Sequence, residues 1–327
     1  MDSLECPARD TEILSDTPAN IEKAAEALRA GELVAFATET VYGLGADATD
    51  DQAVARLFAA KGRPRFNPLI SHIADDSALT DLAEIDERAD TLAETLWPGP
   101  LTLVLPRREG GPICDLACAG LATVAVRMPA HPTARALISA AGRPIAAPSA
   151  NRSGAVSATT VKHVMNDLAG QVRFVLASGR PEAGIESTII DLTDDQPRLL
   201  RPGAIPREDI EALIGPLATG KDSPDGPRSP GRLASHYAPR ASLRLSVDIP
   251  EIGEAYLAFG PTLHKGDLVL NLSEKGDMTQ AAGNLYAMLR SLDELGVDRI
   301  AVAPIPQEGL GDAINDRLQR AAAPRPA

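Results

Sequence analysis

Three cationic side chains, Lys61, Arg63 and Arg65, stand within five residues in a chain whose formal net charge is −13. The stretch that carries them, KGRPRFNPL, lies between a predicted helix and a predicted strand. Arginine can bind phosphate oxygens bidentately, and lysine supplies a compact point charge. We therefore predict an anion site that includes Lys61 and Arg63. A solvated helix end, where the helix dipole favours cations, explains the same residues equally well.

Three other features also suit a charged ligand. Arg127 ends an apolar predicted strand, so we expect a carboxylate partner, either a substrate or one of the chain's own acidic residues. The segment from Ser149 to Ser157 is rich in hydroxyl groups and small residues, which lets backbone N–H groups and Oγ atoms approach a phosphate or ribose. An ordinary surface loop would have the same composition. His72 ends another predicted strand, where a lone histidine is more often structural than catalytic.

Two glycine motifs and a cysteine pair are weaker signals. The segment from Gly43 to Ala48 fits G-x-G-x-x-A between a strand and a helix, but no acidic residue ends a second strand about 20 residues later. A tight turn that lets backbone segments pack closely is an equally good interpretation. The segment 215–222 has the frame of a phosphate loop, but Asp222 replaces the magnesium-binding Ser or Thr, so we reject it. Cys114 and Cys118 have no second ligand pair nearby, which argues against a metal site.

Strands and helices alternate only partly over the first 215 residues. Strands are predicted at 33–36, 68–73, 101–105, 123–127, 144–147, 172–177, 187–192 and 198–201. Helices are predicted at 21–29 behind an Asn20 cap, from an Asp50 or Asp51 cap to Lys61, and at 77–96, 132–141, 159–168 and 207–214. The partial alternation predicts a twisted mixed sheet with helices on it, rather than a purely parallel sheet.

The composition changes between residues 216 and 239, where five prolines and three glycines occur. We predict no regular element there, only an extended linker or an ordered loop. Beyond it, predicted strands and helices indicate a small parallel α/β domain of Rossmann-like type, with strands at 243–245, 255–259, 267–272 and 299–303 and helices at 278–295 and 312–322. The expected division is therefore a first domain at 1–215, a linker at 216–239 and a C-terminal domain at 240–327.

The overall composition limits the possible functions. With 327 residues, 44% hydrophobic and 24% charged, the chain can form two domains with their own cores. The negative net charge and the 3% of aromatic residues argue against strong nucleic-acid binding. No apolar run approaches the ~18 residues of a membrane helix, and the acidic N-terminus does not resemble a signal peptide. Three cysteines fit a reducing compartment, so we expect a cytoplasmic protein without membrane contact.

Several of these stretches together resemble the YrdC-like family. The blocks TETVYGLGADA, KGRPRFNPL, SAN and ESTI occur in the family's order, and the region after Gly215 resembles the extra part of its long form. One departure is Ala37, where the family usually has proline, and we expect a small change in local stiffness there. The resemblance implies a YrdC-like catalytic domain and the synthesis of threonylcarbamoyl-AMP and pyrophosphate from L-threonine, bicarbonate or carbon dioxide, and ATP, for the threonylcarbamoyladenosine modification of tRNA.

The resemblance also implies roles for individual residues. It places L-threonine beside Thr40, His72, Arg127, Ala147 and Ser187. It places ATP beside Arg63, Asn67, Thr123, Ser149, Ser157, Arg201 and Tyr237. We expect Lys61 and Arg63 to be the catalytic residues. Mg²⁺ is expected as the counter-ion of the triphosphate, without a direct protein ligand.

The implied reaction requires no protein nucleophile. The threonine amine is carboxylated, and the carbamate attacks the α-phosphate of ATP, so catalysis rests on holding two anions together, which can supply ~7–11 kcal/mol. The sequence contains no G-x-S-x-G elbow and no Cys/His pair suited to nucleophilic catalysis. The implied partner is the machinery that transfers the product to tRNA. A dinucleotide-dependent enzyme, an RNA-binding module and a different carbamoyl transfer remain as alternatives.

The segment from Lys221 to Pro239 is long for a connector. It carries Arg228, Arg232, His236 and Tyr237, which suit an anionic, purine-bearing ligand. In the family's long form the matching linker lies over the active site. We hypothesise that the segment closes over bound ATP, with Tyr237 near the nucleotide, and the alternative is a simple tether.

Overall fold

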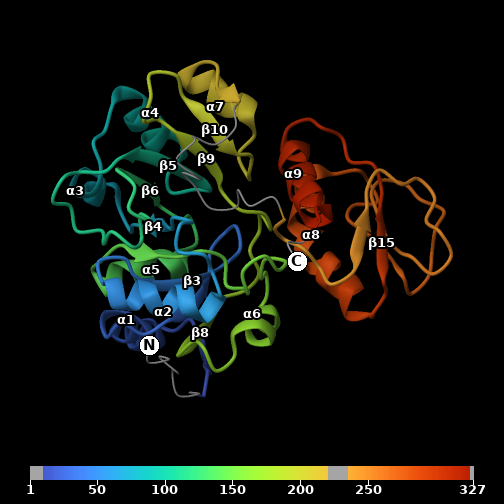
Figure 1. Cartoon of the computed structure of the whole chain (residues 1–327), viewed down its shortest axis with the longest axis horizontal. Helices are drawn as coiled ribbons and strands as arrows, with labels where there is room; N and C mark the ends of the chain where they lie inside the picture. Colours follow the sequence, from blue (N-terminus) through green and yellow to red (C-terminus); the bar gives the residue numbers. More distant parts are fainter. Residues whose placement is uncertain (1–9, 220–234, 325–327) are drawn as a thin grey trace.

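The computed structural model describes residues 10–219 and 235–324, and Figure 1 shows two lobes lying side by side. The larger lobe, coloured blue to yellow, is built on one sheet with the strand order β1-β8-β2-β3-β7-β4-β6-β5-β9-β10-β11. The strands of this sheet are β1 (Glu12–Ser15), β2 (Val34–Ala37), β3 (Tyr42–Asp47), β4 (Ile70–His72), β5 (Leu101–Pro106), β6 (Thr123–Arg127), β7 (Ile145–Ala146), β8 (Phe174–Ala177), β9 (Thr188–Asp191), β10 (Arg198–Arg201) and β11 (Ala218–Thr219).

Pairing within this sheet is mixed, as predicted. Strand β6 is parallel to β4 and antiparallel to β5, and β9 is parallel to β5 and antiparallel to β10. The chain therefore returns to the sheet both through direct reversals and through longer crossovers that contain helices.

Helices cover both faces of the larger sheet. On one face α1 (Pro18–Arg29) and α5 (Pro132–Ala141) pack together over β2 and β8. The core on the other face includes α2 (Asp51–Lys61), the 3₁₀ turn Asp76–Ala78 with α3 (Leu79–Leu82), α4 (Glu87–Leu96), α6 (Val161–Leu168) and α7 (Arg207–Ile214). Strand β2 contributes to both cores, because Val34 and Phe36 face α1 and α5 whereas Ala35 and Ala37 face the opposite side. The strand is therefore fully buried.

The smaller lobe, orange to red in Figure 1, has a parallel sheet with the strand order β12-β15-β13-β14. Its elements are β12 (Ser242–Arg244), β13 (Ala255–Ala258), β14 (Val269–Asn271), α8 (Met278–Glu294), β15 (Arg299–Val302) and α9 (Leu310–Ala322). This parallel α/β arrangement confirms the predicted Rossmann-like type. None of the helices within residues 10–219 and 235–324 has the length and apolar character needed to cross a bilayer. The predicted domain boundaries at 215 and 239 stay predictions.

The two lobes share one core. Val41, Val156 and Ile185 of the larger lobe pack in the same cluster as the buried faces of α8 and α9. The backbones also meet directly, because a Cβ atom on Gly184 would lie 2.4 Å from the Cα atom of Gly283 in α8. Glycine at this contact lets the loop before β9 lie against the helix.

The glycine segment at 43–48 corrects one prediction. Gly43 and Gly45 lie in strand β3, antiparallel to β2, and do not form a turn before a helix. A Cβ atom on Gly45 would lie 2.8 Å from the ring of Phe36 and 3.0 Å from Ile145. The dinucleotide-binding interpretation is therefore wrong, and close packing of the backbone explains the glycines.

Several element boundaries also differ from prediction. The helix predicted at 77–96 is broken, because Ala83 is extended and Asp86 caps a new helix by accepting a hydrogen bond from the Ala89 N–H group. Helix α1 begins earlier than predicted, with Thr17 as its cap instead of Asn20. Strand β1 was not predicted. Strand β11 lies inside the segment 216–239, where no regular element was expected.

Candidate active site

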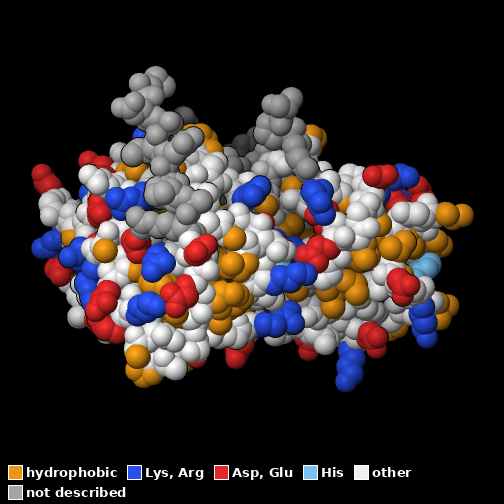
Figure 2. Space-filling view, turned by 90° about the horizontal axis from the view of Figure 1, so that it is seen from below, with side chains coloured by type: hydrophobic (Ala, Val, Ile, Leu, Met, Phe, Trp, Pro, Cys, Tyr) orange, Lys and Arg blue, Asp and Glu red, His pale blue; other side chains and the backbone are white. Residues whose placement is uncertain are grey.

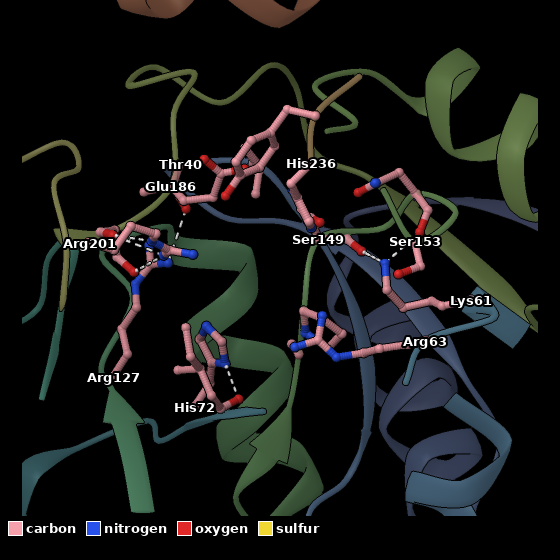
Figure 3. Close-up of a pocket in the computed structure, with 17 residues that line it drawn as sticks. Thr40, Lys61, Arg63, His72, Arg127, Ser149, Ser153, Glu186, Arg201 and His236 are labelled. Atoms are coloured by element: carbon pink, nitrogen blue, oxygen red, sulfur yellow. Dashed lines mark hydrogen bonds between the residues drawn. The ribbon is translucent and has the colours of Figure 1, made fainter. Parts of the chain in front are cut away.

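A pocket in the larger lobe lies where several strands end and residues 236 and 237 approach (Figure 3). Strands β4 and β6 place His72 and Arg127 side by side, because these residues are register partners at the ends of parallel strands. The pocket is lined by Thr40, Val41, Lys61, Arg63, Ile70, His72, Arg127, Ala147, Pro148, Ser149, Asn151, Ser153, Glu186, Ser187, Arg201, His236 and Tyr237.

Lys61 is the last residue of helix α2. Asp50 caps the start of this helix, and Gly62 ends it in the left-handed conformation, with φ of 61°. The Lys61 side chain is buried, and its Nζ donates hydrogen bonds to the carbonyl oxygens of Ser149 and Asn151. Burial, together with the nearby charge of Arg63, lowers the pKa of Lys61 well below its usual value. The two carbonyl acceptors favour the protonated amine, so the helix end delivers a desolvated cation to the serine-rich loop.

Arg63 is held entirely by backbone carbonyl groups among the described residues. Its Nε donates to the Asn67 carbonyl at 3.3 Å, and one terminal nitrogen donates to the Pro68 carbonyl at 3.0 Å. Burial lowers the pKa of Arg63 to about 10, so the guanidinium is still charged at neutral pH. Within the described residues, no carboxylate forms an ion pair with Lys61 or Arg63. Their charge is therefore open to an incoming anion.

Arg127 already has a carboxylate partner. One terminal nitrogen lies 2.6 Å from Oε1 of Glu39, and the other donates to Oγ1 of Thr40 at 3.0 Å. Burial raises the pKa of Glu39, but the charge and hydrogen bond of Arg127 outweigh this and lower it overall. The second carboxylate oxygen of Glu39 is buried and has no hydrogen-bond partner among the described residues. Sequence analysis had left the partner of Arg127 open, and in this structure it is the chain's own Glu39.

His72 lies next to Arg127 and is uncharged. Burial, with a further effect of the Arg127 charge, lowers the pKa of His72 to about 3. Its Nδ1 lies 3.2 Å from the carbonyl oxygen of Ile70, which favours the tautomer with the proton on Nδ1. This tautomer leaves Nε2 as a hydrogen-bond acceptor.

Ser187 and Arg201 form another part of the pocket wall. Ser187 precedes β9, and its Oγ lies 2.7 Å from Oγ1 of Thr102 on the neighbouring strand β5. Arg201, at the end of β10, donates two hydrogen bonds to the Ser187 carbonyl, at 3.1 and 2.9 Å, and one to its Oγ at 3.1 Å. Burial lowers the pKa of Arg201. In Figure 3 the Arg201 and Arg127 side chains lie on the same side of the pocket.

His236 and Tyr237 enter the pocket from the segment predicted as a linker. Both side chains are buried, and their rings meet edge to face with centroids 4.0 Å apart. Tyr237 has a φ of 60°, an uncommon conformation for a residue with a side chain. The prediction that Tyr237 approaches the site agrees with this position. The rest of the proposed lid, residues 221–234, lies outside the described residues.

The pocket brings together ten of the thirteen predicted site residues. Asn67 does not line it; its carbonyl accepts a hydrogen bond from Nε of Arg63, and its Oδ1 is buried without a partner in the described structure. Thr123 begins strand β6, about 13 Å from the Arg127 end at ~3.3 Å per residue. The Oγ of Ser157 is buried and donates to Oε1 of Glu186 at 2.6 Å. Here Asn67, Thr123 and Ser157 do not line the pocket, and their predicted contacts with ATP stay predictions.

Sequence reasoning did not assign roles to several residues of the site. Glu39 and Glu186 stood inside the recognised blocks TET and EST, but nothing local indicated their basic partners. Asn151 stood in the SAN block, and its carbonyl oxygen now accepts from Lys61. The pocket-lining residues that are not among the thirteen predicted site residues are Val41, Ile70, Pro148, Asn151, Ser153, Glu186 and His236.

The site is suited to bind anions. Four of its lining side chains are cationic, namely Lys61, Arg63, Arg127 and Arg201. Within residues 10–219 and 235–324, no group of three or more His, Cys, Asp and Glu side chains is placed to hold a metal ion. The pocket thus offers electrostatic stabilisation and positioning as its chemical means.

Comparison with known proteins assigns the chain to a family. Residues 26–203 match the model of the Sua5/YciO/YrdC family, described as telomere recombination, and residues 205–323 match the model of the threonylcarbamoyl-AMP synthase C-terminal domain. The threonylcarbamoyl-AMP synthase of Bacillus subtilis is 43% identical, over 96% of this chain and 96% of that protein. The enzyme of the same name from Pyrococcus abyssi is 45% identical, over 92% of this chain and 93% of that protein.

Solved structures agree with this assignment. The crystal structure of Pyrococcus abyssi Sua5 complexed with L-threonine has a TM-score of 0.88 and 42% identity, over 96% of this chain and 98% of that chain. Both the fold and the sequence are thus shared over almost the whole length. The chain therefore belongs to the Sua5/YciO/YrdC family, in the form that carries the C-terminal domain of threonylcarbamoyl-AMP synthases.

Proposed function

We propose that this protein is a threonylcarbamoyl-AMP synthase, a nucleotidyltransferase that converts L-threonine, bicarbonate or carbon dioxide, and ATP into threonylcarbamoyl-AMP and pyrophosphate. The observation that carries the proposal is one pocket in which two cations without carboxylate partners in the described structure, Lys61 and Arg63, lie near an arginine that already holds a carboxylate, Arg127. Such a pocket suits a triphosphate beside an amino acid. The names of the full-length relatives support the same reaction.

Each half of the pocket has a proposed ligand. Lys61 and Arg63 hold ATP phosphates, and their charges stabilise the negative charge that develops at the α-phosphorus. The threonine carboxylate approaches Arg127 near Thr40 and Ser187, where neutral His72 can accept a hydrogen bond. Holding carbamate and nucleotide in one desolvated site replaces a bimolecular encounter with a positioned attack.

Magnesium enters this proposal with the nucleotide. The lining carboxylate Glu186 already accepts hydrogen bonds on both oxygens, and the described residues offer no carboxylate cluster. The chain's residues therefore fit an ion held by triphosphate oxygens and water better than one held by protein ligands. When bound, the ion neutralises phosphate charge.

Its proposed setting is tRNA modification in the cytoplasm, with a separate transfer machinery as the downstream partner. The face shown in Figure 2 carries acidic and basic side chains interspersed. The formal net charge of −13 supports hand-over of a small product in preference to strong tRNA binding by this chain.

Pyrophosphate release tests the proposed function. With ATP, magnesium, bicarbonate and each amino acid in turn, release should require L-threonine and bicarbonate together, and mass spectrometry should detect threonylcarbamoyl-AMP. Omitting bicarbonate under carbon dioxide-free conditions is the matched control. Release that does not depend on the amino acid, or a product without the carbamoyl group, would overturn the proposal.

A further inference from the structure

Glu186 connects the pocket to the smaller lobe. Its Oε1 accepts a hydrogen bond from Ser157 Oγ at 2.6 Å. Its Oε2 accepts one from the hydroxyl of Tyr286 in α8 at 2.7 Å and one from Nε of Arg317 in α9 at 2.8 Å. Two of the three donors to this pocket-lining carboxylate therefore come from the smaller lobe.

The pair between Glu186 and Arg317 is buried on both sides. Arg317 has a fully buried side chain, and Glu186 is 6% exposed. Burial raises the pKa of Glu186, but the charges of Arg317 and Arg201 and the hydrogen bonds outweigh it and lower the pKa to about 2. The carboxylate is thus ionised at neutral pH. Without Arg317 it would be a poorly compensated buried charge, which is strongly unfavourable and displaces the group or adds a proton.

The smaller lobe also holds the ring of Tyr237. The Arg317 guanidinium lies 5.2 Å from the centroid of this ring, and the ring of Tyr286 stacks on it with centroids 5.7 Å apart. The same two side chains thus contact both Glu186 and Tyr237. These two pocket residues are fixed relative to each other through the smaller lobe.

The anchoring reaches groups that face the substrates. Ser187 directly follows Glu186, and it makes hydrogen bonds with Thr102 and Arg201. A rearrangement of Glu186 that displaces the following peptide changes the pocket near Ser187 and Arg201. A displacement of about 1 Å at such a position can cost 10²-fold in rate.

We propose that Arg317 and Tyr286 of the smaller lobe are positioning residues of the pocket, which act on the substrates through Glu186 and Tyr237. Neither side chain lines the pocket in the described structure. The inference deepens the proposed function and rests on it. According to this inference, the smaller lobe is a structural part of the substrate site and does not only lie beside it.

The first test replaces Arg317 and uses a neighbour on the same helix as control. Arg317→Met should lower kcat/KM for pyrophosphate release about tenfold or more, as expected for loss of a charge-assisted hydrogen bond. At least one substrate KM should rise. Arg320→Met is the matched control, because Arg320 also pairs with Asp316, whereas among the described residues its side chain has no hydrogen bond or ion pair with Glu186. Equal kinetics for the two variants would overturn the inference.

The second test is mild enough to preserve the fold. Tyr286→Phe removes the hydroxyl that binds Glu186 and keeps the stacked ring, and it should raise a substrate KM several-fold. Tyr256→Phe is the control, since it also removes a buried hydroxyl of the smaller lobe, one that donates to the Val247 carbonyl. A purely structural defect would lower the active fraction, and therefore kcat, with unchanged KM values in both variants. That outcome would count against a positioning role.

A double-mutant cycle tests whether the effect passes through Glu186. If it does, adding Arg317→Met to Glu186→Gln should cost much less than it costs in the wild type, because the buried charge is already gone. Additive effects would contradict the inference.

These experiments distinguish failure of the proposed function from failure of the positioning role. A wild-type protein that releases no pyrophosphate would refute the synthase assignment. The inference would then be tested by calorimetric binding of ATP and of L-threonine separately. Unchanged affinities for both ligands in Arg317→Met and Tyr286→Phe would overturn the positioning role.

Discussion

The pocket has a first side with the cations Lys61 and Arg63 and a second side with the cation Arg127, and the charges on the two sides are neutralised to different extents. Lys61 and Arg63 are held by backbone carbonyl groups, whereas Arg127 is ion-paired with Glu39 and hydrogen-bonded to Thr40. Carbonyl dipoles fix a cation without neutralising it. A carboxylate neutralises its partner and must share it when a second anion binds. The first side therefore suits a highly charged triphosphate, and the second suits the single carboxylate of an amino acid.

The comparison predicts its largest effect at Lys61. Lys61→Met removes a buried positive charge, leaves the Asn151 carbonyl without its donor, and leaves the Ser149 carbonyl with only the Asn151 N–H group among the described residues. We expect kcat/KM for pyrophosphate release to fall by about 100-fold or more. Steady-state kinetics measure the change. Lys162→Met is the control, since Lys162 makes an exposed ion pair with Glu294. Near-normal activity in a folded Lys61→Met variant would contradict the inference that the positive charge of Lys61 serves the reaction.

A somewhat smaller effect is expected at Arg63. Arg63→Ala should weaken ATP binding by ~1.5–3 kcal/mol, or roughly 10- to 150-fold, because a charge-assisted contact to phosphate is lost. Threonine affinity should change little. Calorimetric titration of each ligand provides the measurement. Arg65→Ala, an exposed position in the same loop, should bind ATP like the wild type. Equal ATP affinity in the two variants would place Arg63 outside the nucleotide site.

The opposite pattern is expected at Arg127. Arg127→Ala should raise the threonine KM about tenfold or more and leave ATP affinity nearly unchanged. Ser187→Ala should have the same pattern with a smaller effect, since it removes a neutral hydrogen-bonding group. Kinetics with each substrate varied in turn separate the two cases. Loss of ATP affinity with unchanged threonine use would show that the two halves of the pocket had been assigned in reverse.

The last prediction concerns stability and pH instead of substrate binding. The folded pKa of His72 is about 3, below its usual 6.5, so its neutral form stabilises the fold fully above pH 6.5 and loses this contribution as the pH falls toward 3. Between pH 7 and 5 one such histidine should cost about 2 kcal/mol of unfolding free energy. Urea unfolding at the two pH values should show that His72→Gln loses about that much less than the wild type. An identical pH dependence would mean that His72 is not buried in the neutral form.

Some helices were predictable because the residues that begin and end them are adjacent to them in the sequence. Helix α5 has the predicted bounds, since Pro132 fits its first turn and Gly142 ends it in the left-handed conformation. The helix predicted at 77–96 failed because the short break before Asp86 interrupts an otherwise helical pattern. Gly43 and Gly45 were misjudged for a different reason. Gly45 lies against Phe36 and Ile145, and Gly43 lies against Ala147 and Phe36, neighbours that sequence spacing does not reveal.

In the candidate site, too, residues with a local sequence signal were predictable and contacts between distant residues were not. The cations Lys61 and Arg63 were visible as a local cluster, and family blocks added Thr40, Ser187 and other lining residues. Contacts between distant residues were not visible. Glu186 and Arg317 are 131 residues apart, and Glu39 and Arg127 are 88 residues apart. No local pattern records such partners, because they are brought together by the sheet order and by the docking of the two lobes.

The separation of Glu186 and Arg317 has a consequence for synthesis on the ribosome. A growing chain can complete the larger sheet once β11 has emerged, because β11 pairs with β10 at the edge of that sheet. It cannot complete the hydrogen bonds of Glu186 until α9 has also been made and has left the exit tunnel. Between these two events the Glu186 carboxylate of the nascent protein has no ion pair with Arg317. The complete pocket geometry therefore forms only when α9 docks.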